Sequence, residues 1–479
     1  MKIIGRKKER EKLAELYGSS KPEFLAVYGR RRVGKTFLIT ETFKKDFVFS
    51  HAAISPVEGE EITTADQIHS FYLSLRQYGL KETKEPDNWF DCFFMLQKLL
   101  DGKRNGKKQV LFIDELPWLD TKHSKFISAL ENFWNKYGCF QDDLLLIVSG
   151  SSNSWIVNKL INNKGGLYDR VTYEMKLSPF TLNECEEFLV SNGVHYSRYE
   201  IVQAYMVFGG IPFYLGFIDK KLSLAQNIDS IFFSKEAKLR LEFNRLFSAT
   251  FDNSLKVSSV VKFLSTRNCG YTRDEICSFL KLKSGGGISE LLDGLLSSDL
   301  VMKYVPYKGN KRYQYYRLID PFCIFYLRFV ENVNSLNTEF YSNSVESQSI
   351  RSWMGIGYEN VCFNHISQIK RALGINGISS TQSIWYKKGT ASESGHQIDL
   401  VIDRKDGVIN LCEVKFCKNL YSMDKDDHLT LMDREDDFLA LIEKRKHVNH
   451  VLITTFGIKN GGYSSDFTNV ITLDELFER

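Results

Sequence analysis

Uninterrupted apolar segments are the strongest signal in the first third of the chain. They occupy residues 24–28 (FLAVY), 110–113 (VLFI) and 144–148 (LLLIV). A strand that is buried on both faces reads as such a run, because neither face meets water. Segments with apolar positions at helical spacing lie beside these strands, at residues 37–43, 89–100 and 126–134. Strands that alternate with helices predict an α/β domain with a parallel sheet.

The pattern then becomes helical and changes again after about residue 255. Helix-like segments at 182–190 and 201–208 end at Gly209-Gly210-Ile211-Pro212. Three short amphipathic segments and two strand-like ones follow, at residues 257–264, 272–280, 288–296, 300–307 and 312–318. Thr272 is the expected N-cap of the second helix, with Glu275 as its capping-box partner. Three helices and a hairpin resemble a winged helix-turn-helix.

Charge leaves the role of this region open. The third helix, where a recognition helix would lie, carries Glu290 and Asp293 and no Lys or Arg, which opposes entry into a DNA groove. The hairpin is basic through Lys303, Lys308, Lys311 and Arg312. These side chains either hold a phosphate backbone or form a solvated turn, so contact with DNA is undecided.

The last part of the chain reads as a further α/β segment after a polar connector. Its expected elements are a helix at 357–373, strands at 384–387, 397–402 and 409–416, a helix at 438–444 and a strand at 451–455. Residues 404–407 form a short turn between the second and third strands, as in an antiparallel hairpin.

A length of 479 residues exceeds what one core supports, and roughly 150 residues per domain predicts about three domains. The changes of pattern divide the chain more finely. We expect an α/β core at 1–177, a helical segment at 178–250, a winged helix at 251–330, a connector at 331–350 and a second α/β domain at 351–479.

Composition narrows the class of protein. A hydrophobic fraction of 43% and a charged fraction of 25% are typical of globular chains. There is no run of about 18 apolar residues and no apolar signal region, so we expect a cytoplasmic protein with no membrane partner. The nine cysteines form no C-x-x-C pair, which argues against zinc and disulfides. A net charge of +4 neither requires nor excludes nucleic acid.

The sequence GRRRVGKT at 29–36 follows the first apolar strand and precedes a helix. It matches the phosphate-binding loop G-x-x-x-x-G-K-[ST], in which glycines let backbone N–H groups turn toward phosphate oxygens. The lysine of such a loop reaches the β and γ phosphates, and the hydroxyl binds Mg²⁺. The candidate nucleotide-binding residues are Gly29, Arg30, Arg31, Arg32, Val33, Gly34, Lys35 and Thr36.

Asp114 and Glu115 stand where the second apolar strand ends. In a P-loop enzyme the first carboxylate holds Mg²⁺ and a following one polarises the attacking water. We therefore assign the metal role to Asp114, together with Thr36, and the role of general base to Glu115. ATP and Mg²⁺ are the expected cofactors.

These motifs resemble the AAA+ superfamily and the related signal-transducing P-loop ATPases of prokaryotes. The resemblance implies that Ile4-Gly5-Arg6 lies near the adenine and that Gly209 to Pro212 belongs to a lid, so that residues 178–250 are a helical lid. It also implies a polar sensor at the tip of the third strand and an arginine finger, Arg170, acting in cis or from a neighbouring copy. The sensor candidates are Ser149, Ser151, Ser152 and Asn153.

A second set of chemical groups lies near the end of the chain. Strands joined by a short turn bring Asp399 and Glu413 within reach, and a period of two puts Glu413 and Lys415 on one face. Two carboxylates and a lysine suit metal-assisted phosphodiester hydrolysis. This set resembles the PD-(D/E)XK nuclease superfamily, which implies metal binding by Asp399, Glu413 and the helical Glu359.

The sequence thus predicts an α/β protein, with a P-loop AAA+ sheet, a helical lid, a winged helix and a restriction-endonuclease-like α/β domain. The first hypothesis for function is an ATPase that switches a metal-dependent nuclease-like domain acting on DNA or RNA. The alternative is a nucleotide-switched regulatory protein whose C-terminal domain binds a partner without cleavage. Homo-oligomers are compatible with both.

Overall fold

The computed structural model describes residues 2–55, 62–248, 251, 253–282, 285–310, 312–333, 337–387, 389, 395–442 and 445–479. The chain divides into two compact units. The first comprises Met1–Pro179, Asn244–Ser258 and Gly286–Asp299, and the second comprises Phe180–Phe243, Ser259–Gly285 and Leu300–Arg479. The first unit thus takes two segments from beyond the expected boundary at residue 177. The division into five domains stays a prediction.

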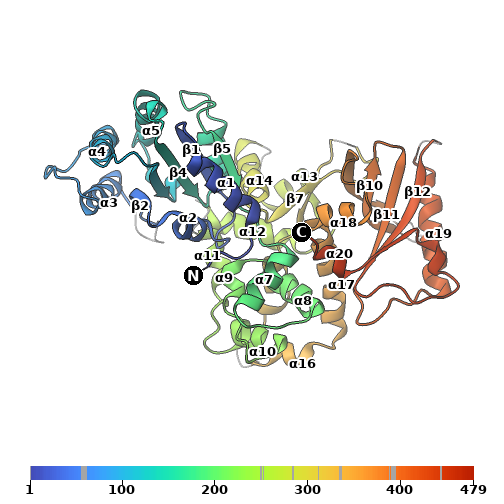
Figure 1. Ribbon diagram of the computed structural model, residues 1–479. Coiled ribbons are helices and arrows are strands. Elements are labelled where there is room, and N and C mark those ends of the chain that lie inside the picture. Colours follow the sequence, from blue (N-terminus) through green and yellow to red (C-terminus); the bar gives the residue numbers. More distant parts are fainter. Residues whose placement is uncertain are drawn as a thin grey trace. The chain divides into compact units, whose positions relative to one another are not determined.

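The first unit contains a five-stranded parallel sheet of order β2-β3-β4-β1-β5 (Figure 1). Its strands are β1 (Glu23–Tyr28), β2 (Phe47–Ala52), β3 (Gln109–Asp114), β4 (Leu144–Gly150) and β5 (Tyr173–Lys176). Its helices are α1 (Lys7–Gly18), α2 (Lys35–Phe43), α3 (Thr64–Gln77), α4 (Trp89–Gly102), η1 (Leu116–Leu119), α5 (Phe126–Lys136), η2 (Gly138–Phe140), α6 (Asn153–Trp155), η3 (Ile156–Ile161) and α14 (Gly286–Ser297). The predicted parallel α/β core is confirmed, although β2, β5 and α3 were not expected.

Register places the ends of the central strands side by side. Tyr28 at the end of β1 pairs with Gly150 of β4, and Ile113 near the end of β3 pairs with Val148. Because all these strands are parallel, the loops that follow them emerge at one edge of the sheet. That edge carries the phosphate loop, the acidic pair and the polar tip of β4.

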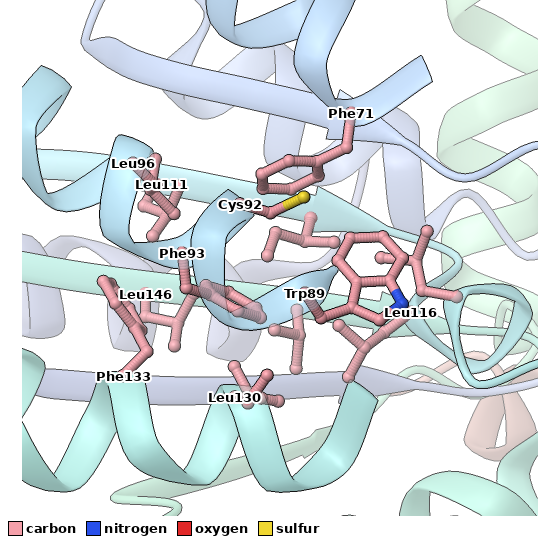
Figure 2. Packing of buried hydrophobic residues seen from close by; sticks show 14 of the residues in the cluster. Phe71, Trp89, Cys92, Phe93, Leu96, Leu111, Leu116, Leu130, Phe133 and Leu146 are labelled. Atoms are coloured by element: carbon pink, nitrogen blue, oxygen red, sulfur yellow. The ribbon is translucent and has the colours of Figure 1, made fainter. Parts of the chain in front are cut away.

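The core of this unit lies between the sheet and helices α3, α4 and α5. Trp89 and Phe93 of α4 are buried against Phe71 of α3 and Phe133 of α5, over Leu111 and Leu146 of the sheet (Figure 2). The rings of Phe93 and Phe133 stack with centroids 5.2 Å apart. Large aromatic side chains contribute much of the buried apolar area, so this cluster holds the strands that carry the site in a fixed register.

The second unit begins with the helices of the expected lid. They are α7 (Leu182–Ser191), α8 (Arg198–Phe208), α9 (Pro212–Leu215), α10 (Leu224–Ile228) and η4 (Asp229–Phe233). Gly209 ends α8 in the left-handed conformation, and a Cβ at Gly210 would lie 2.4 Å from the carbonyl oxygen of Phe180. The glycine pair is therefore required by a tight turn between α8 and α9. Its contact with a nucleotide stays a prediction.

A three-stranded antiparallel sheet of order β6-β8-β7 also belongs to the second unit. It comprises β6 (Tyr271–Thr272), β7 (Val301–Tyr304) and β8 (Tyr315–Leu318), with α13 (Arg273–Phe279) after β6. Thr272 caps α13 in the predicted box with Glu275. Helices α11 (Glu242–Ser248) and α12 (Ser254–Leu264) cross the unit boundary. Helix α14 lies in the first unit and Lys311 lies outside the described residues, so the winged helix stays a prediction.

The C-terminal elements form a mixed five-stranded sheet of order β13-β12-β11-β10-β9, with α19 against one face (Figure 1). Its strands are β9 (Ser380–Lys387), β10 (His396–Arg404), β11 (Val408–Lys415), β12 (His447–Thr454) and β13 (Asn469–Ile471). The helices after β8 are α15 (Pro321–Phe325), η5 (Tyr326–Val330), α16 (Phe340–Ser344), α17 (Gln348–Asn364), α18 (Ile366–Ala372), α19 (Lys425–Leu439), η6 (Ser464–Asp466) and α20 (Leu473–Leu476). Strands β9, β10 and β11 are antiparallel, and β12 runs parallel to β11.

Two helices in this region were predicted with the wrong bounds. Helix α17 begins at Gln348, where Ser347 caps it, and not at Gly357, because a buried face starts at Ile350. The expected helix at 357–373 is also interrupted at His365, after which α18 begins at Ile366. The helix expected at 438–444 overlaps only the last two residues of α19, which runs from Lys425, behind the N-cap Asp424, to Leu439. Residues 443 and 444 lie outside the described residues. The exposed charged residues of α19 hid the helical period. Among the described residues, no helix has the length and apolar character needed to span a membrane.

Candidate functional site

The phosphate loop joins β1 to α2 and depends on two glycines with positive φ. Gly29 has φ of 150°, and a Cβ there would lie 2.2 Å from the carbonyl oxygen of Leu177. Gly34 has φ of 94° and precedes the first residue of α2, with nothing within 4 Å of the place of a Cβ. The loop therefore packs tightly at its start and is open at its end. The N-terminus of a helix binds anions well, because its first backbone N–H groups have no partner within the helix.

Lys35 is folded against the loop itself. Its side chain lies in a residue that is only 5% exposed, and Nζ donates to the carbonyl oxygens of Gly29 at 2.8 Å and Arg30 at 3.2 Å. Burial lowers the pKa of Lys35, although the charges of Glu115 and Asp114 oppose this. A buried ammonium that faces two carboxylates can bind a phosphate without a large change in solvation.

The side chain of Asp114, at the end of β3, contacts both the phosphate loop and the end of β4. Oδ2 of Asp114 accepts a hydrogen bond from Oγ1 of Thr36 at 2.7 Å, and Oδ1 accepts from the hydroxyl of Ser149. The hydroxyl of Thr36 and the carboxylate of Asp114 thus lie side by side, as the two oxygens that share a Mg²⁺ ion in P-loop enzymes must. This pair fits the predicted metal role.

The carboxylate of Glu115 contacts the polar tip that follows β4. Glu115 adopts φ of 52°, and Oε2 accepts hydrogen bonds from the backbone N–H of Ser151 at 2.8 Å and from its hydroxyl at 2.9 Å. Ser151 therefore fixes the direction of the carboxylate that we assign as general base. The base must exchange this partner for a water molecule before it can act.

Asn153 contacts the start of the phosphate loop. It is buried, and Oδ1 accepts the N–H of Gly29 at 2.8 Å while Nδ2 donates to the carbonyl oxygen of Ser297 in α14 at 2.7 Å. Of the sensor candidates, Ser149 bonds to Asp114 and Ser151 to Glu115, whereas Asn153 reaches the loop. The polar tip after a buried strand was the signal for all three, but their partners could not be read from it.

Arg6 also contacts the phosphate loop. It adopts a left-handed conformation in the Ile-Gly-Arg turn, and Nη2 donates to the carbonyl oxygen of Val33 at 3.3 Å. Within the loop, Nη1 of Arg31 donates to the carbonyl oxygen of Arg245 at 3.2 Å. Sequence analysis did not anticipate that these arginines bind backbone carbonyl groups.

Arg170 is exposed and precedes β5. The N–H of Thr172 donates to the carbonyl oxygen of Phe24 at 2.9 Å, near the beginning of β1. The phosphate loop follows the end of β1, five residues further on, and a strand rises about 3.3 Å per residue. Arg170 therefore lies toward the opposite edge of the sheet from the loop. This placement does not support a finger in cis, and action from a neighbouring copy stays a prediction.

The carboxylates predicted near the C-terminus converge in the second unit. Asp399 of β10 lies beside β11, and its Oδ2 accepts the N–H of Val414 at 3.1 Å. Burial raises the pKa of Asp399 to about 8, with further contributions from the charges of Glu413 and Glu359. Burial also raises the pKa of Glu359, partly opposed by Arg317. A raised carboxylate pKa among like charges is typical of a functional cluster.

Basic side chains already form ion pairs with two of these carboxylates. Glu413 pairs with Lys415 at 2.8 Å and with Arg434 of α19 at 2.7 Å. Glu359 of α17 pairs with Arg317 of β8 at 3.2 Å, where the side chain of Arg317 is only 3% exposed. Burial lowers the pKa of Lys415, but Glu413 and Asp399 outweigh it and raise the value. Neither arginine was predicted to belong to the site, although Arg317 is the one charged residue in β8.

In the part of the chain that the structure describes, no group of three or more His, Cys, Asp or Glu side chains is arranged to hold a metal ion. Asp399 and Glu413 repel each other, as the raised pKa of Asp399 indicates, and a divalent cation would relieve that repulsion. One carboxylate oxygen of Glu359, Oε2, is already engaged by Arg317, which leaves Glu359 less available as a ligand. The donor set therefore fits a metal at Asp399 and Glu413, and fits Glu359 less well.

Comparison with known families gives a match for the N-terminal part of the chain. Residues 4–218 match a family described as an ATPase domain predominantly from Archaea. This range covers the phosphate loop, the acidic pair, the tip of β4 and the turn after α8. The N-terminal part of the chain is therefore a P-loop ATPase domain, and the protein is an ATP-hydrolysing enzyme.

Individual relatives are distant. An uncharacterised protein of Methanocaldococcus jannaschii is 23% identical over 92% of this chain and 96% of its own. Among solved structures, a Walker-type ATPase of Pyrococcus abyssi has a TM-score of 0.48 and 18% identity, over 68% of this chain and 96% of its own. The ORC2 protein of Aeropyrum pernix has a TM-score of 0.39 and 12% identity, over 74% and 95%.

Proposed function

We propose that the ATPase domain at residues 4–218 binds ATP and Mg²⁺ through the phosphate loop, and hydrolyses ATP with Glu115 as general base. The observation that carries this proposal is the meeting of Lys35, Thr36 and Asp114 at one edge of the parallel sheet. The ammonium, the hydroxyl and the carboxylate are the three groups that a bound Mg²⁺-triphosphate requires of a P-loop.

Each group has a separate task in this scheme. Backbone N–H groups from Gly29 to Thr36 hold phosphate oxygens, and Lys35 exchanges the carbonyl oxygens of Gly29 and Arg30 for the β and γ phosphates. Thr36 and Asp114 would hold Mg²⁺, which neutralises charge on the phosphates. Glu115 leaves Ser151 and takes the proton of the attacking water.

Two variants separate binding from hydrolysis. K35A removes the ammonium, so we expect at least a tenfold loss of ATP affinity by calorimetry in Mg²⁺ buffer. E115Q keeps the size of the side chain and its bonds to Ser151 but cannot accept a proton, so ATP binds while phosphate release falls about 100-fold or more. Normal turnover by E115Q would show that another group is the base.

The role of Arg170 has its own test. A finger that acts in trans requires a second copy, so we propose that R170A hydrolyses ATP slowly and that activity per chain in the wild type rises with protein concentration. Mixing R170A with K35A should give more activity than the two variants give separately, because each variant supplies the group that the other lacks. A mixture that gives no more activity than the separate variants would remove Arg170 from the mechanism.

For the C-terminal site we propose metal-dependent hydrolysis of nucleic acid, controlled by the ATPase domain. Support comes from three carboxylates and a lysine that approach from α17, β10 and β11, and from the raised pKa of Asp399. Mg²⁺ would be held by Asp399 and Glu413 and would polarise the phosphate, while Lys415 stabilises the developing negative charge. The pairing of Glu359 with Arg317 favours the alternative, in which the domain binds a partner without cleavage.

Cleavage distinguishes these alternatives. The full chain is incubated with single- and double-stranded DNA and RNA in Mg²⁺ or Mn²⁺, with and without ATP, beside D399A and K415A. Products formed by the wild type and absent from both variants support the nuclease. Equal products in all samples indicate a contaminant, and binding without products supports the alternative.

A further inference from the structure

Asn153 connects the phosphate loop to a helix far along the chain. Both ends of its amide are engaged: Oδ1 accepts the N–H of Gly29 and Nδ2 donates to the carbonyl oxygen of Ser297, the last residue of α14. An N–H can only donate and a carbonyl can only accept, so the two partners fix the orientation of the amide. Because Asn153 is buried, losing either bond would leave a polar group without water.

A second contact fastens the same end of α14 to the sheet. Nζ of Lys176, the last residue of β5, lies 2.5 Å from Oδ1 of Asp299. The next residue, Leu177, donates its N–H to the carbonyl oxygen of Tyr28 at 2.7 Å and packs against Gly29. The start of the phosphate loop is therefore enclosed by Asn153 and Leu177, and α14 is attached beside both.

The exposed face of α14 does not suit nucleic acid. Glu290 and Asp293 are exposed on it, whereas Ile288, Leu292 and Leu295 are buried. A helix with an acidic face repels the phosphate backbone, so groove entry is not its task. Its attachment to the nucleotide site indicates a different use.

We infer that Asn153 is a positioning residue that makes the docking of α14 depend on the nucleotide. This inference rests on nucleotide binding at the phosphate loop. When phosphates order the loop, Gly29 is held in place, its N–H keeps Asn153 fixed, and Asn153 holds the end of α14. Coupling between sites is reciprocal, so a chain with α14 released binds nucleotide more weakly. The residues that follow α14, from Leu300 onward, lead directly into β7.

Hydrogen exchange of α14 tests this coupling. The full chain is compared alone and with Mg²⁺ and ATPγS, and exchange is followed in peptides spanning residues 286–299. We expect nucleotide to slow exchange in this helix by about five- to tenfold, the lower range of known couplings between sites. Unchanged or faster exchange would overturn the inference.

The variant N153D separates the two bonds of the amide. Aspartate still accepts the N–H of Gly29 but cannot donate to Ser297, so we expect α14 to exchange faster than in the wild type and with no response to nucleotide. N153A loses both bonds and should bind ATPγS more weakly than N153D. A nucleotide response of α14 in N153D equal to that of the wild type would show that Asn153 has only a structural role.

A matched control lies outside the nucleotide site. D299N weakens only the ion pair with Lys176, so α14 should exchange faster while still responding to nucleotide. Calorimetry on the same samples keeps the two proposals apart. If the wild type does not bind ATPγS, the nucleotide site itself is wrong; if it binds and α14 does not respond, only the role of Asn153 is wrong.

Discussion

Position 29 requires glycine for two independent reasons. Its φ of 150° belongs to a region that other residues avoid, and a Cβ would lie 2.2 Å from the carbonyl oxygen of Leu177, well inside van der Waals contact. The neighbouring carbonyl is backbone and cannot rotate away as a side chain would. The start of the phosphate loop is thus locked to the end of β5.

We predict that G29A lowers the free energy of unfolding by about 2 kcal/mol or more and weakens ATP binding at least tenfold, because the loop must shift. Urea unfolding and calorimetry measure the two effects. G102A is the control: Gly102 ends α4 with nothing within 4 Å of a Cβ, so alanine there should be neutral or stabilise by up to about 1 kcal/mol. Equal effects of both variants would contradict the steric argument.

His365 connects three helices, α7, α17 and α18. It lies between α17 and α18, contacts the carbonyl oxygen of Val361 through Nδ1 at 2.8 Å, and accepts the N–H of Leu182, the first residue of α7, at 3.0 Å. Burial lowers the pKa of His365 to about 4, partly opposed by the bond to Val361. The neutral ring is needed because a protonated one could not accept from Leu182.

This assignment predicts a pH dependence of stability. The native pKa lies below the value of about 6.5 in the unfolded chain, so the unfolded state binds more protons as pH falls. The contribution of His365 is complete above pH 6.5 and is lost progressively toward pH 4, by about 2 kcal/mol at pH 5. In urea unfolding, the stability difference between the wild type and H365Q should therefore shrink from pH 7 to pH 5. A difference that is constant with pH would contradict a buried neutral histidine, and H195Q, at an exposed position, is the control.

The limits of some helices can be read from the sequence, and those of others cannot. Helix α13 begins where its capping box lies in the sequence, because Thr272 and Glu275 satisfy backbone groups of their own turn. Helix α19 has a similar cap at Asp424, but its exposed acidic residues conceal a face on which Leu431 and Phe438 are buried. Local caps are visible in sequence, whereas a sparse buried face is recognised only against its partner.

Across the second unit, β8 and α17 are tied together by the buried pair of Arg317 and Glu359. The guanidinium of Arg317 also lies 5.4 Å from the ring of Phe363. A buried ion pair contributes little net stability, but removing one partner leaves a charge without compensation. Glu359 would then face the carboxylates of Glu413 and Asp399 without the positive charge of Arg317.

We predict that R317M lowers the free energy of unfolding by about 3 kcal/mol or more, and that the double variant R317M/E359Q recovers much of this loss. Thermal unfolding with and without Mn²⁺ then tests the metal site without an activity assay. If the three carboxylates can hold a cation, Mn²⁺ should raise the melting temperature of R317M more than that of the wild type or the double variant. An equal effect of Mn²⁺ on all three would argue against a metal at Glu359.

The sequence by itself determined the parallel sheet of the first unit, the position of the phosphate loop and the carboxylate pairs. These depend on patterns within single segments: runs buried on both faces, glycines in a fixed motif, and carboxylates at strand ends. The hairpin that brings Asp399 to Glu413 was also readable, because a short turn between two strands leaves few registers.

Tertiary structure alone decided the partners of these groups. Asn153 meets Ser297 across 144 positions, Glu115 meets Ser151 at the end of the neighbouring strand, and Arg317 meets Glu359 from another element. No local pattern encodes such contacts, because hydrogen bonds and ion pairs act over a few ångströms in space and are indifferent to separation along the chain. Helix α14 accordingly belongs to the unit that contains the phosphate loop, although the sheet that follows it in sequence belongs to the other unit.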